Sequence, residues 1–493
     1  MKKEDKMSIS ATGRRSFLKK LGGVSAGIAS VGSLVKAADG TPAIPAGSTY
    51  MGDFGAPKLD KVKVAIIGVG ARGPTHLSHI AAAEGTEVVG ICDLYEDAVN
   101  RGRQMALNAD AERHKNVKTF HGDEHAYRKM LLETKPDAVW IATPWEWHAP
   151  MAIDCMKAGA HAFVEVPLAT SIEDLWKIIE TSESTKRHCM MLENVNYGRE
   201  ELMFLNMCRQ GVFGELLHAE AAYIHELRGQ MGEYERGRGT GSWRTLHWAN
   251  ENGNLYPTHG LGPVAQYMNL GRGDDSFRRL VSFSTPARNH ELYAKEALGP
   301  DSKSIKLDFS KGGDLNTSII KTTLGRTVMV QWDESSPRPY SRHNLIQGTR
   351  GTGAGFPNRI ALDYTWKNAT PELRKLLGLP EDKPDQRSNY HSWIEGGGFD
   401  AFYEHFDHPL FKRMESIAKK HGGHGGMDAI MNFRAIECLI KGEALDQNLY
   451  EGAFWSAVTP LSRKSVAEDG MPQDFPDFTR GRWKSTKPLA IIS

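Results

Sequence analysis

The chain has 493 residues, of which 40% are hydrophobic, and its 61 lysines and arginines nearly balance its 60 aspartates and glutamates. This length and apolar content allow a sizeable core and two or more domains, whereas a formal net charge of +1 excludes whole-molecule attraction to nucleic acid or anionic lipid and favours a small-molecule ligand. The cysteines form neither a metal-binding nor a disulfide pattern and are interpreted as buried apolar side chains: Cys92, Cys155, Cys189, Cys208 and Cys438.

The first 37 residues have the features of a twin-arginine export signal. Arg14 and Arg15 precede a Phe-Leu pair and a weakly apolar run over residues 21–35, which is shorter than the roughly 20 residues of a spanning helix. A small-residue cleavage signature ends at Ala37. We therefore expect a signal peptide over residues 1–37, a periplasmic or cell-surface protein, and no stable membrane span after signal removal. A basic disordered arm or an uncleaved anchor is the alternative.

The next part of the chain predicts a doubly wound α/β domain. Residues 38–60 are rich in Gly, Pro and Ala and are interpreted as a linker or surface arm. Three β-branched strands follow, over 61–70, 86–93 and 137–144, with helical patterns between them. Strands that alternate with helices of this length indicate a parallel sheet with crossover connections, which we place at residues 61–196.

Residues 197–493 predict a second, α+β domain with a mainly antiparallel open sheet. Its longer strands are joined by turns, and helices and irregular loops dominate from residue 352 onward. The exposed face of such a sheet often pairs with another copy, which predicts a homodimer. The expected strands cover residues 216–227, 277–286, 314–335 and 344–351.

A glycine motif follows the first predicted strand. Gly68, Gly70 and Gly73 stand between a strand and a helix, where glycines let the backbone turn tightly and approach a pyrophosphate at the helix N-terminus. Asp93 ends the second strand, at the spacing of the acid that binds a ribose 2′-hydroxyl. The motif therefore predicts a dinucleotide site. An acid there repels a 2′-phosphate, which favours NAD over NADP. Arg72 could bind that phosphate, so NADP remains an alternative.

Aromatic and acidic side chains follow the later strands, at the sheet edge where open α/β sheets bind ligands. Trp145 and Trp147 lie in the stretch TPWEWHAP, and Glu165 lies in FVEVPLA. The two indole rings would wall a nicotinamide or stack on a sugar, and packing under a loop is the plainer alternative.

The stretch HGGHGGMD places His421 and His424 at a spacing that suits a metal. A metal site needs three or four ligands, and the glycines indicate a tight loop before a helix that begins near Asp428. We therefore predict no metal here.

The stretches VAIIGVGARG, CDLYEDAV and ATPWEWHAPMAIDCMKAGAHAFVEVPLA resemble the Gfo/Idh/MocA superfamily of nicotinamide proteins. Most relatives carry Glu-Lys-Pro where this chain has Glu165-Val166-Pro167, and the lysine usually helps a dehydrogenase reaction. The dehydrogenases also tend to place an aspartate four residues before a histidine, where this chain has Leu255 before His259. Both departures argue against an ordinary dehydrogenase.

With these departures, the chain is similar to glycoside hydrolase family 109, the NAD-dependent α-N-acetylgalactosaminidases. The resemblance also includes the stretches MLENVNYGREELMFLNMCRQGVFGEL, NLYPTHGLGPVAQYM and HGGHGGMD. The resemblance covers nearly the whole chain from about residue 60. It implies NAD contacts from Ala71, Arg72, Asp93, Trp145, Glu146, Trp147, His148, Glu165, Val166 and Asn194. It implies contacts with a glycoside or glycan substrate from Tyr223, Arg244, Tyr256, Pro257, Thr258, His259 and Tyr340.

The resemblance also implies a reaction with no net redox change. The sugar is oxidised at C3, loses its C1 substituent by elimination, adds water and is reduced again by the same cofactor. Such a cycle needs no pair of catalytic carboxylates and calls for bases and proton donors of the His and Tyr type. We expect His259 and Tyr256 to be the acid/base pair and Tyr197 to be a further general base or an orienting group. Which base serves C2 and which serves C3 is left open.

Two other functions are compatible with the sequence. One is an exported NAD(P)-dependent sugar oxidoreductase that uses a trapped cofactor on two substrates in turn, and the other is a non-catalytic module that binds NAD or a sugar. The absent Glu-Lys-Pro lysine weighs against the first, and the concentration of His, Tyr and Arg in the second domain weighs against the second.

Overall fold

A computed structural model describes residues 42–44 and 47–491. The predicted signal peptide over residues 1–37 and its twin arginines lie outside the described residues. The described residues from 47 onward belong to one compact unit. All five cysteines are free thiols, and four are buried while Cys208 is half-buried. Within the described ranges, no helix combines the length and the apolar character needed to cross a bilayer.

The first sheet has six parallel strands in the order β3-β2-β1-β4-β5-β6, as the alternation of strands and helices predicts. The chain order reverses at β1, which pairs with β2 on one side and β4 on the other, and ligands bind at such switch points. The strands are β1 (Val62–Ile67), β2 (Thr86–Cys92), β3 (Lys118–Phe120), β4 (Ala138–Ile141), β5 (His161–Val164) and β6 (Cys189–Met191). The crossover helices are α1 (Gly73–Ala82), α2 (Glu96–Ala109), α3 (Ala126–Thr134), α4 (Trp145–Lys157) and α5 (Ile172–Thr185).

The second sheet has nine strands, and all of its neighbouring pairs are antiparallel except the parallel pair β7–β10. The mainly antiparallel sheet predicted from the sequence is therefore confirmed. The expected strand over 314–335 is a hairpin of two strands, β9 and β10. The strands are β7 (Leu216–Ile224), β8 (Phe277–Pro286), β9 (Gly313–Thr322), β10 (Thr327–Asp333), β11 (Leu345–Gly348), β12 (Gly351–Ala354), β13 (Arg359–Leu362), β14 (Ile394–Glu395) and β15 (Gln473–Asp474).

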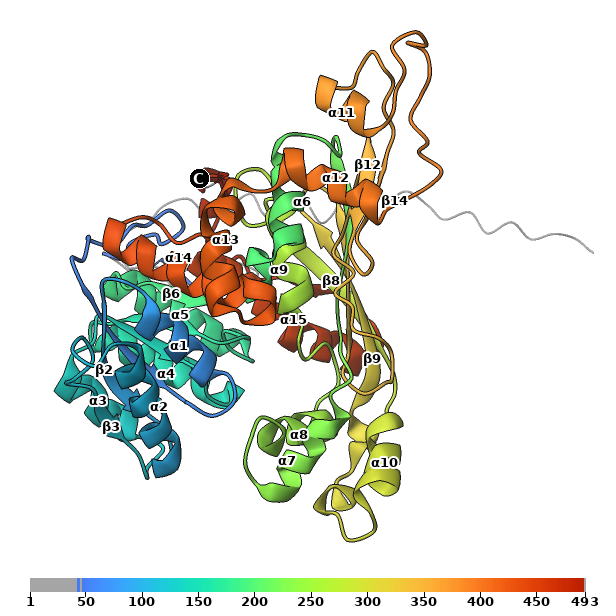
Figure 1. Ribbon diagram of the computed structural model, residues 1–493. Coiled ribbons are helices and arrows are strands. Elements are labelled where there is room, and N and C mark those ends of the chain that lie inside the picture. Colours follow the sequence, from blue (N-terminus) through green and yellow to red (C-terminus); the bar gives the residue numbers. More distant parts are fainter. Residues whose placement is uncertain (1–41, 45–46, 492–493) are drawn as a thin grey trace, which may run out of the picture. The chain divides into compact units, whose positions relative to one another are not determined.

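The late helices return to the first sheet. In Figure 1 the orange and red helices α14 (Met427–Lys441) and α15 (Leu449–Ala467) lie beside its blue and green elements, and α14 packs against α1. Apolar side chains of α14, such as Ile430 and Met431, share a core with Val62 and Val64 of β1. Residues near position 430 therefore lie close to the glycine turn after β1.

The other helices connect the strands of the second sheet or pack around it. A 3₁₀ turn, η1 (Asn194–Tyr197), follows β6, and another, η6 (His424–Gly426), precedes α14. The helices are α6 (Arg199–Arg209), α7 (Met231–Arg236), α8 (Gly241–Asn250), α9 (Thr258–Tyr267), α10 (Asn289–Tyr293), α11 (Pro371–Leu376), α12 (Gly397–Phe406) and α13 (Pro409–His421).

Candidate active site

The turn between β1 and α1 has the backbone that a dinucleotide phosphate requires. Gly68 has φ +86°, and a Cβ there would lie 2.3 Å from the carbonyl oxygen of Ala142. A Cβ on Gly73 would lie 1.9 Å from the carbonyl oxygen of Gly68. A Cβ on Gly70, by contrast, would meet no described atom within 4 Å. Two glycines therefore allow close packing, and the third leaves open space beside the helix N-terminus.

Asp93 stands next to this turn, as its spacing predicts. Its Oδ2 accepts a hydrogen bond from the Val69 amide at 2.8 Å, and its Oδ1 accepts one from the Tyr95 amide at 3.1 Å. These bonds fix the carboxylate at the end of β2, on the wall of a cavity of about 760 Å³. That volume lies within the range of sites for small ligands and cofactors.

Most of the predicted cofactor contacts meet at this cavity. The predicted residues in its lining are Gly68, Gly70, Ala71, Arg72, Asp93, Trp145, Trp147, His148, Glu165, Val166, Arg244 and Tyr256. Both ring nitrogens of His148 lie within hydrogen-bond distance of backbone carbonyl oxygens, those of Pro167 at 2.6 Å and Thr143 at 2.9 Å. The ring of His148 therefore joins the loops that follow β4 and β5.

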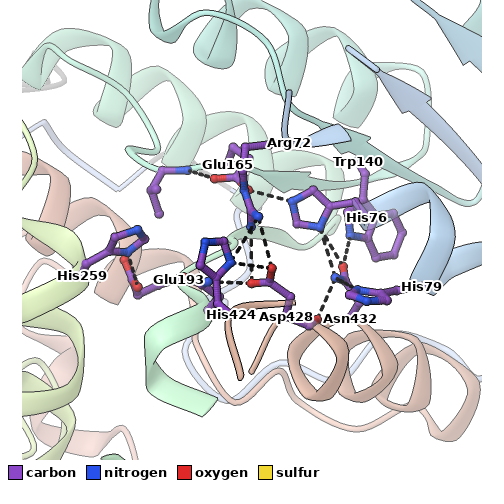
Figure 2. A network of polar contacts seen from close by, with 12 residues as sticks. Arg72, His76, His79, Trp140, Glu165, Glu193, His259, His424, Asp428 and Asn432 are labelled. Carbon is purple, nitrogen blue, oxygen red and sulfur yellow. Dashed lines mark hydrogen bonds and ion pairs between the residues drawn. The ribbon is translucent and has the colours of Figure 1, made fainter. Parts of the chain in front are cut away.

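A polar network holds Arg72 beneath the cavity. Figure 2 shows its guanidinium between Glu165, which follows β5, and Asp428 of α14. Its Nε donates to Glu165 Oε1 at 3.0 Å, and its terminal nitrogens donate to Asp428 at 3.1 and 3.3 Å. Because two carboxylates engage this side chain, Arg72 is not free to bind a 2′-phosphate. The reason for considering NADP as the cofactor is therefore removed.

Glu165 is ionised despite its burial. Burial opposes the charge of this carboxylate, but the charge of Arg72 and a 2.7 Å hydrogen bond with His76 hold its pKa below the ordinary value. Its Oε2 also accepts a hydrogen bond from the Val166 amide at 3.1 Å. The carboxylate is thus fixed next to Val166, which stands where most relatives have a lysine.

Asp428 anchors the same network from the other end of the chain. It accepts a hydrogen bond from Asn194 Nδ2 at 2.6 Å and pairs with His424 Nδ1 at 2.8 Å. Burial opposes its charge, whereas the His424 contact and the charge of Arg72 hold its pKa well below the ordinary value. Among the described residues, no group of three potential ligands is arranged to hold a metal. The HGGHGGMD stretch instead supplies a carboxylate and an imidazole to the Arg72 network.

The candidate substrate side consists of aromatic rings around Arg244. Tyr223 of β7 lies 4.6 Å from Tyr256 and 5.3 Å from His259, between ring centroids. Tyr256 lies 5.0 Å from His259, and the guanidinium of Arg244, on α8, lies 5.2 Å from the Tyr256 ring. Burial raises the pKa of Tyr256 well above its ordinary value, Tyr223 adds to the rise, and the charge of Arg244 opposes it. Tyr256 is therefore a neutral phenol that can donate a proton.

His259 is held by a carboxylate that the sequence analysis missed. Glu193 follows β6, is fully buried, and brings its Oε1 to 2.7 Å from Nδ1 of His259, a contact that Figure 2 shows separately from the Arg72 network. His259 lies in the first turn of α9, which begins after Pro257. A carboxylate at Nδ1 favours the tautomer with the proton on Nδ1 and leaves Nε2 free to accept a proton. The strand-end rule that singled out Glu165 would also have found Glu193.

Four buried polar atoms around these groups have no hydrogen-bond partner among the described residues. They are Glu193 Oε2, Asn194 Oδ1, Arg244 Nε and Thr258 Oγ1. Buried polar atoms in folded proteins are normally paired. Of these residues, Arg244 lines the cavity, so its Nε is available to a polar ligand there.

Other predicted residues lie elsewhere. Tyr197 is buried in the core, outside the cavity lining, and its hydroxyl donates to Asp446 Oδ2 at 3.3 Å. This placement does not support its expected role as a base, because its phenol faces a buried carboxylate rather than the cavity. Glu146 is exposed on α4. Asn194 is connected to Arg72 through Asp428. Tyr340 is 38% exposed, with its ring 6.2 Å from that of Tyr223.

The segment between α7 and α8 covers part of the cofactor cavity. Arg238 contacts Asp97 of α2 at 2.9 and 3.1 Å, and its guanidinium lies 4.1 Å from the Tyr95 ring. All three residues line the cavity. Residues 237–240 of the second domain thus form a strap that reaches the helix following β2.

Comparisons with solved structures define the class of protein. The fold is similar to levoglucosan dehydrogenase in complex with NADH and levoglucosan, with a TM-score of 0.59 and 18% identity over 85% of this chain and 100% of that one. It is also similar to scyllo-inositol dehydrogenase from Lactobacillus casei, with a TM-score of 0.55 and 11% identity over 84% and 99%. Residues 62–193 match the family of oxidoreductases with an NAD-binding Rossmann fold. The chain therefore has an NAD-binding Rossmann domain, and its cofactor is NAD.

The second half of the chain identifies the family. Residues 197–485 match the C-terminal domain of glycosyl hydrolase 109. The chain is 55% identical to glycosyl hydrolase family 109 protein 1 of Akkermansia muciniphila, over 98% of this chain and 99% of that protein. It is 48% identical to an α-N-acetylgalactosaminidase of Shewanella oneidensis, over 97% and 98%. The chain belongs to glycosyl hydrolase family 109 and is a glycoside hydrolase.

Proposed function

We propose that this enzyme hydrolyses terminal α-linked N-acetylgalactosamine with no net redox change. The observation that carries the proposal is the imidazole of His259, held by a buried carboxylate 2.7 Å away beside the phenols of Tyr223 and Tyr256. The activity named for the relative from Shewanella oneidensis supports this substrate.

The cofactor supplies the part of the chemistry that these side chains lack. When bound, NAD provides a hydride acceptor and then a hydride donor for C3 of the sugar, which makes the C2 proton acidic enough to remove. The residues around the glycine turn fit this group, because Gly70 leaves space for the pyrophosphate and Asp93 stands at the ribose position.

The protein residues move protons and hold the sugar. Nε2 of His259 accepts a proton from the substrate, and Glu193 stabilises the resulting imidazolium. The neutral phenol of Tyr256 donates a hydrogen bond to an oxygen on which negative charge develops. Arg244 binds sugar or acetamido oxygens, and its Nε, without a partner among the described residues, is suited to that task. These residues accept a proton and stabilise the developing charge without a pair of catalytic carboxylates.

The proposal is tested with the purified protein, a chromogenic α-N-acetylgalactosaminide and no added NAD. We expect release of the chromophore, dinucleotide that co-purifies with the chain, and no growth of NADH absorbance. Steady NADH formation from a free sugar and added NAD, without glycoside cleavage, would instead establish a sugar oxidoreductase. A protein that is purified without NAD, cannot bind it and cleaves nothing would refute the proposal.

We further propose export by the twin-arginine route to the periplasm and assembly as a homodimer. Arg14 and Arg15 support the first proposal, and the pairing of exposed sheet faces in such domains supports the second. Replacement of both arginines by lysine should leave the protein in the cytoplasm on cell fractionation. Light scattering on the purified enzyme measures its mass in solution, and a monomeric mass would refute the dimer.

A further inference from the structure

A second hollow lies beside Tyr340. Its volume is about 350 Å³, which is large enough for a small ligand. It is formed where the start of α6 meets the loop between β12 and β13. Its lining residues are Glu200, Glu201, Arg342, Phe356, Pro357 and Asn358.

A row of aromatic rings connects this hollow to the candidate catalytic residues. Ring centroids lie 4.6 Å apart for Tyr256 and Tyr223, 6.2 Å apart for Tyr223 and Tyr340, and 5.6 Å apart for Tyr340 and Phe356. Exposure rises along the row, from 8% and 7% for Tyr256 and Tyr223 to 38% and 37% for Tyr340 and Phe356. The row therefore leads from the enclosed site outward to solvent.

Arg342 fixes the two outer rings. It is buried, donates to the Tyr340 hydroxyl at 2.9 Å, and places its guanidinium 4.8 Å from the Phe356 ring. Its other terminal nitrogen donates to Glu201 at 2.6 Å. The two exposed rings thus contact the arginine of a buried ion pair, which sets their orientation before any ligand binds.

The backbone around the outer rings is strained. Phe356 has φ +56°, and His343 and Asn344 have φ +59° and +48°. The two loops are joined by a hydrogen bond from the Gly355 amide to the His343 carbonyl at 2.9 Å. A bulky residue in the left-handed region is unfavourable and tends to occur where function requires it. Phe356 places an aromatic ring at a position where glycine would fit the backbone better.

We propose that Tyr340 and Phe356 form the subsite for the second sugar ring of the substrate, the neutral sugar to which the terminal N-acetylgalactosamine is linked. This inference rests on the proposed function. Exposed ring faces flanked by polar groups suit a pyranose, which has apolar C–H faces and hydroxyl edges. The cation of the hollow, Arg342, is compensated by Glu201 at 2.6 Å, and Glu200 adds a further carboxylate. Because the positive charge of Arg342 is already compensated, the hollow favours a neutral sugar over an acidic one.

The test compares two substrates that differ only in the second ring. These are methyl α-N-acetylgalactosaminide and a disaccharide in which the same sugar is α-linked to galactose. Because binding energy from a remote group contributes to transition-state stabilisation, we expect the wild-type kcat/KM to be higher for the disaccharide, by about fivefold or more.

The variant Phe356→Gly removes the ring and adopts φ +56° without strain, so its folding is not put at risk. It should lower the ratio of the two kcat/KM values about fivefold. Phe356→Tyr, which keeps a ring, should restore the ratio. Phe283→Ala is the matched control, because Phe283 is an aromatic residue of β8 that is 58% exposed; its ratio should equal that of the wild type.

The outcomes separate the two proposals. If the wild type hydrolyses neither substrate, the proposed function fails and the subsite fails with it. If it hydrolyses both but without preference, or if Phe356→Gly keeps the wild-type ratio, the glycosidase stands and the subsite is refuted. A ratio that falls in Phe356→Gly and is restored in Phe356→Tyr supports the subsite.

Discussion

The cofactor side and the substrate side of this site are built on different principles. On the cofactor side, Arg72 lies between Glu165 and Asp428, and each carboxylate also has an imidazole partner. On the substrate side, the groups are mostly aromatic rings. His259 and Arg244 each face a single buried carboxylate, and Arg244 Nε has no hydrogen-bond partner among the described residues. A compensated charge network suits a group that is held permanently, whereas open donors suit a molecule that binds and leaves.

The largest expected effect tests whether the substrate side acts independently of the cofactor side. His259→Ala and Tyr256→Phe should each lower turnover of the chromogenic glycoside by about a hundredfold to a thousandfold. The first removes the group that accepts the substrate proton, and the second removes a hydrogen-bond donor to the developing negative charge. The NAD content per chain should stay at the wild-type level, measured by absorbance after denaturation. Tyr390→Phe, a 40% exposed phenol, is the control. Near-normal turnover in both variants would refute the assigned roles.

The next effect concerns the cofactor side alone. Asp428→Asn removes one of the two negative charges that hold Arg72, and we expect NAD to bind about tenfold more weakly, a moderate loss because the Arg72 side chain is 31% exposed. Calorimetric titration of the cofactor-stripped protein measures it. Asp474→Asn, which breaks the exposed pair with Arg279, should leave affinity unchanged. Equal affinity in the Asp428 variant would show that the network does not position the cofactor site.

A smaller effect is expected where the two sides meet, at the Arg238 strap. Arg238→Ala removes an exposed ion pair with Asp97 and a contact with the Tyr95 ring. We expect NAD to dissociate roughly twofold to fivefold faster, measured by competition with a fluorescent analogue. Arg279→Ala removes a comparable surface pair elsewhere and should not change the rate. An unchanged rate in Arg238→Ala would show that the strap does not retain the cofactor.

The last prediction concerns stability, not activity or cofactor binding, and tests the packing behind the substrate side. His290 is stacked on Trp248 of α8, and burial lowers its pKa to about 3 from 6.5. Its contribution to stability is fully present above pH 6.5 and is lost as the pH falls from 6.5 toward 3, because the unfolded imidazole takes up a proton first. The slope is about 1.4 kcal/mol per pH unit for one proton. His290→Phe should make the pH dependence of urea unfolding shallower over this window; an unchanged slope would show that His290 does not titrate as stated.

The sequence predicts those parts of the site whose signals are local. Gly68, Gly70 and Asp93 follow successive strands, and the alternation of strands and helices alone brings them to one edge of the sheet. Glu165 is found by the same rule. Glu193 follows β6 in the same way and stands in the stretch MLENVNYG, where the resemblance assigns a role to its neighbour Asn194 but none to Glu193 itself.

Asp428 shows where local reasoning ends. It contacts Arg72 across 356 positions of sequence, and no periodicity or spacing encodes which distant helix covers a given turn. The histidines of its stretch HGGHGGMD have a spacing that suits a metal, but it is the aspartate that contacts Arg72. Tyr197 illustrates the converse, because its place in the sequence suggests chemistry and only the fold shows that its hydroxyl contacts Asp446.

The contact between Arg72 and Asp428 also bears on the order of events during biosynthesis. A ribosome adds Arg72 to the growing chain 356 residues before it adds Asp428. Until the helix that carries Asp428 docks, the guanidinium of Arg72 has lost one of its two counter-charges, so a nascent or C-terminally truncated polypeptide would be poorly prepared to capture a dinucleotide. We therefore expect cofactor loading to follow the docking of α14.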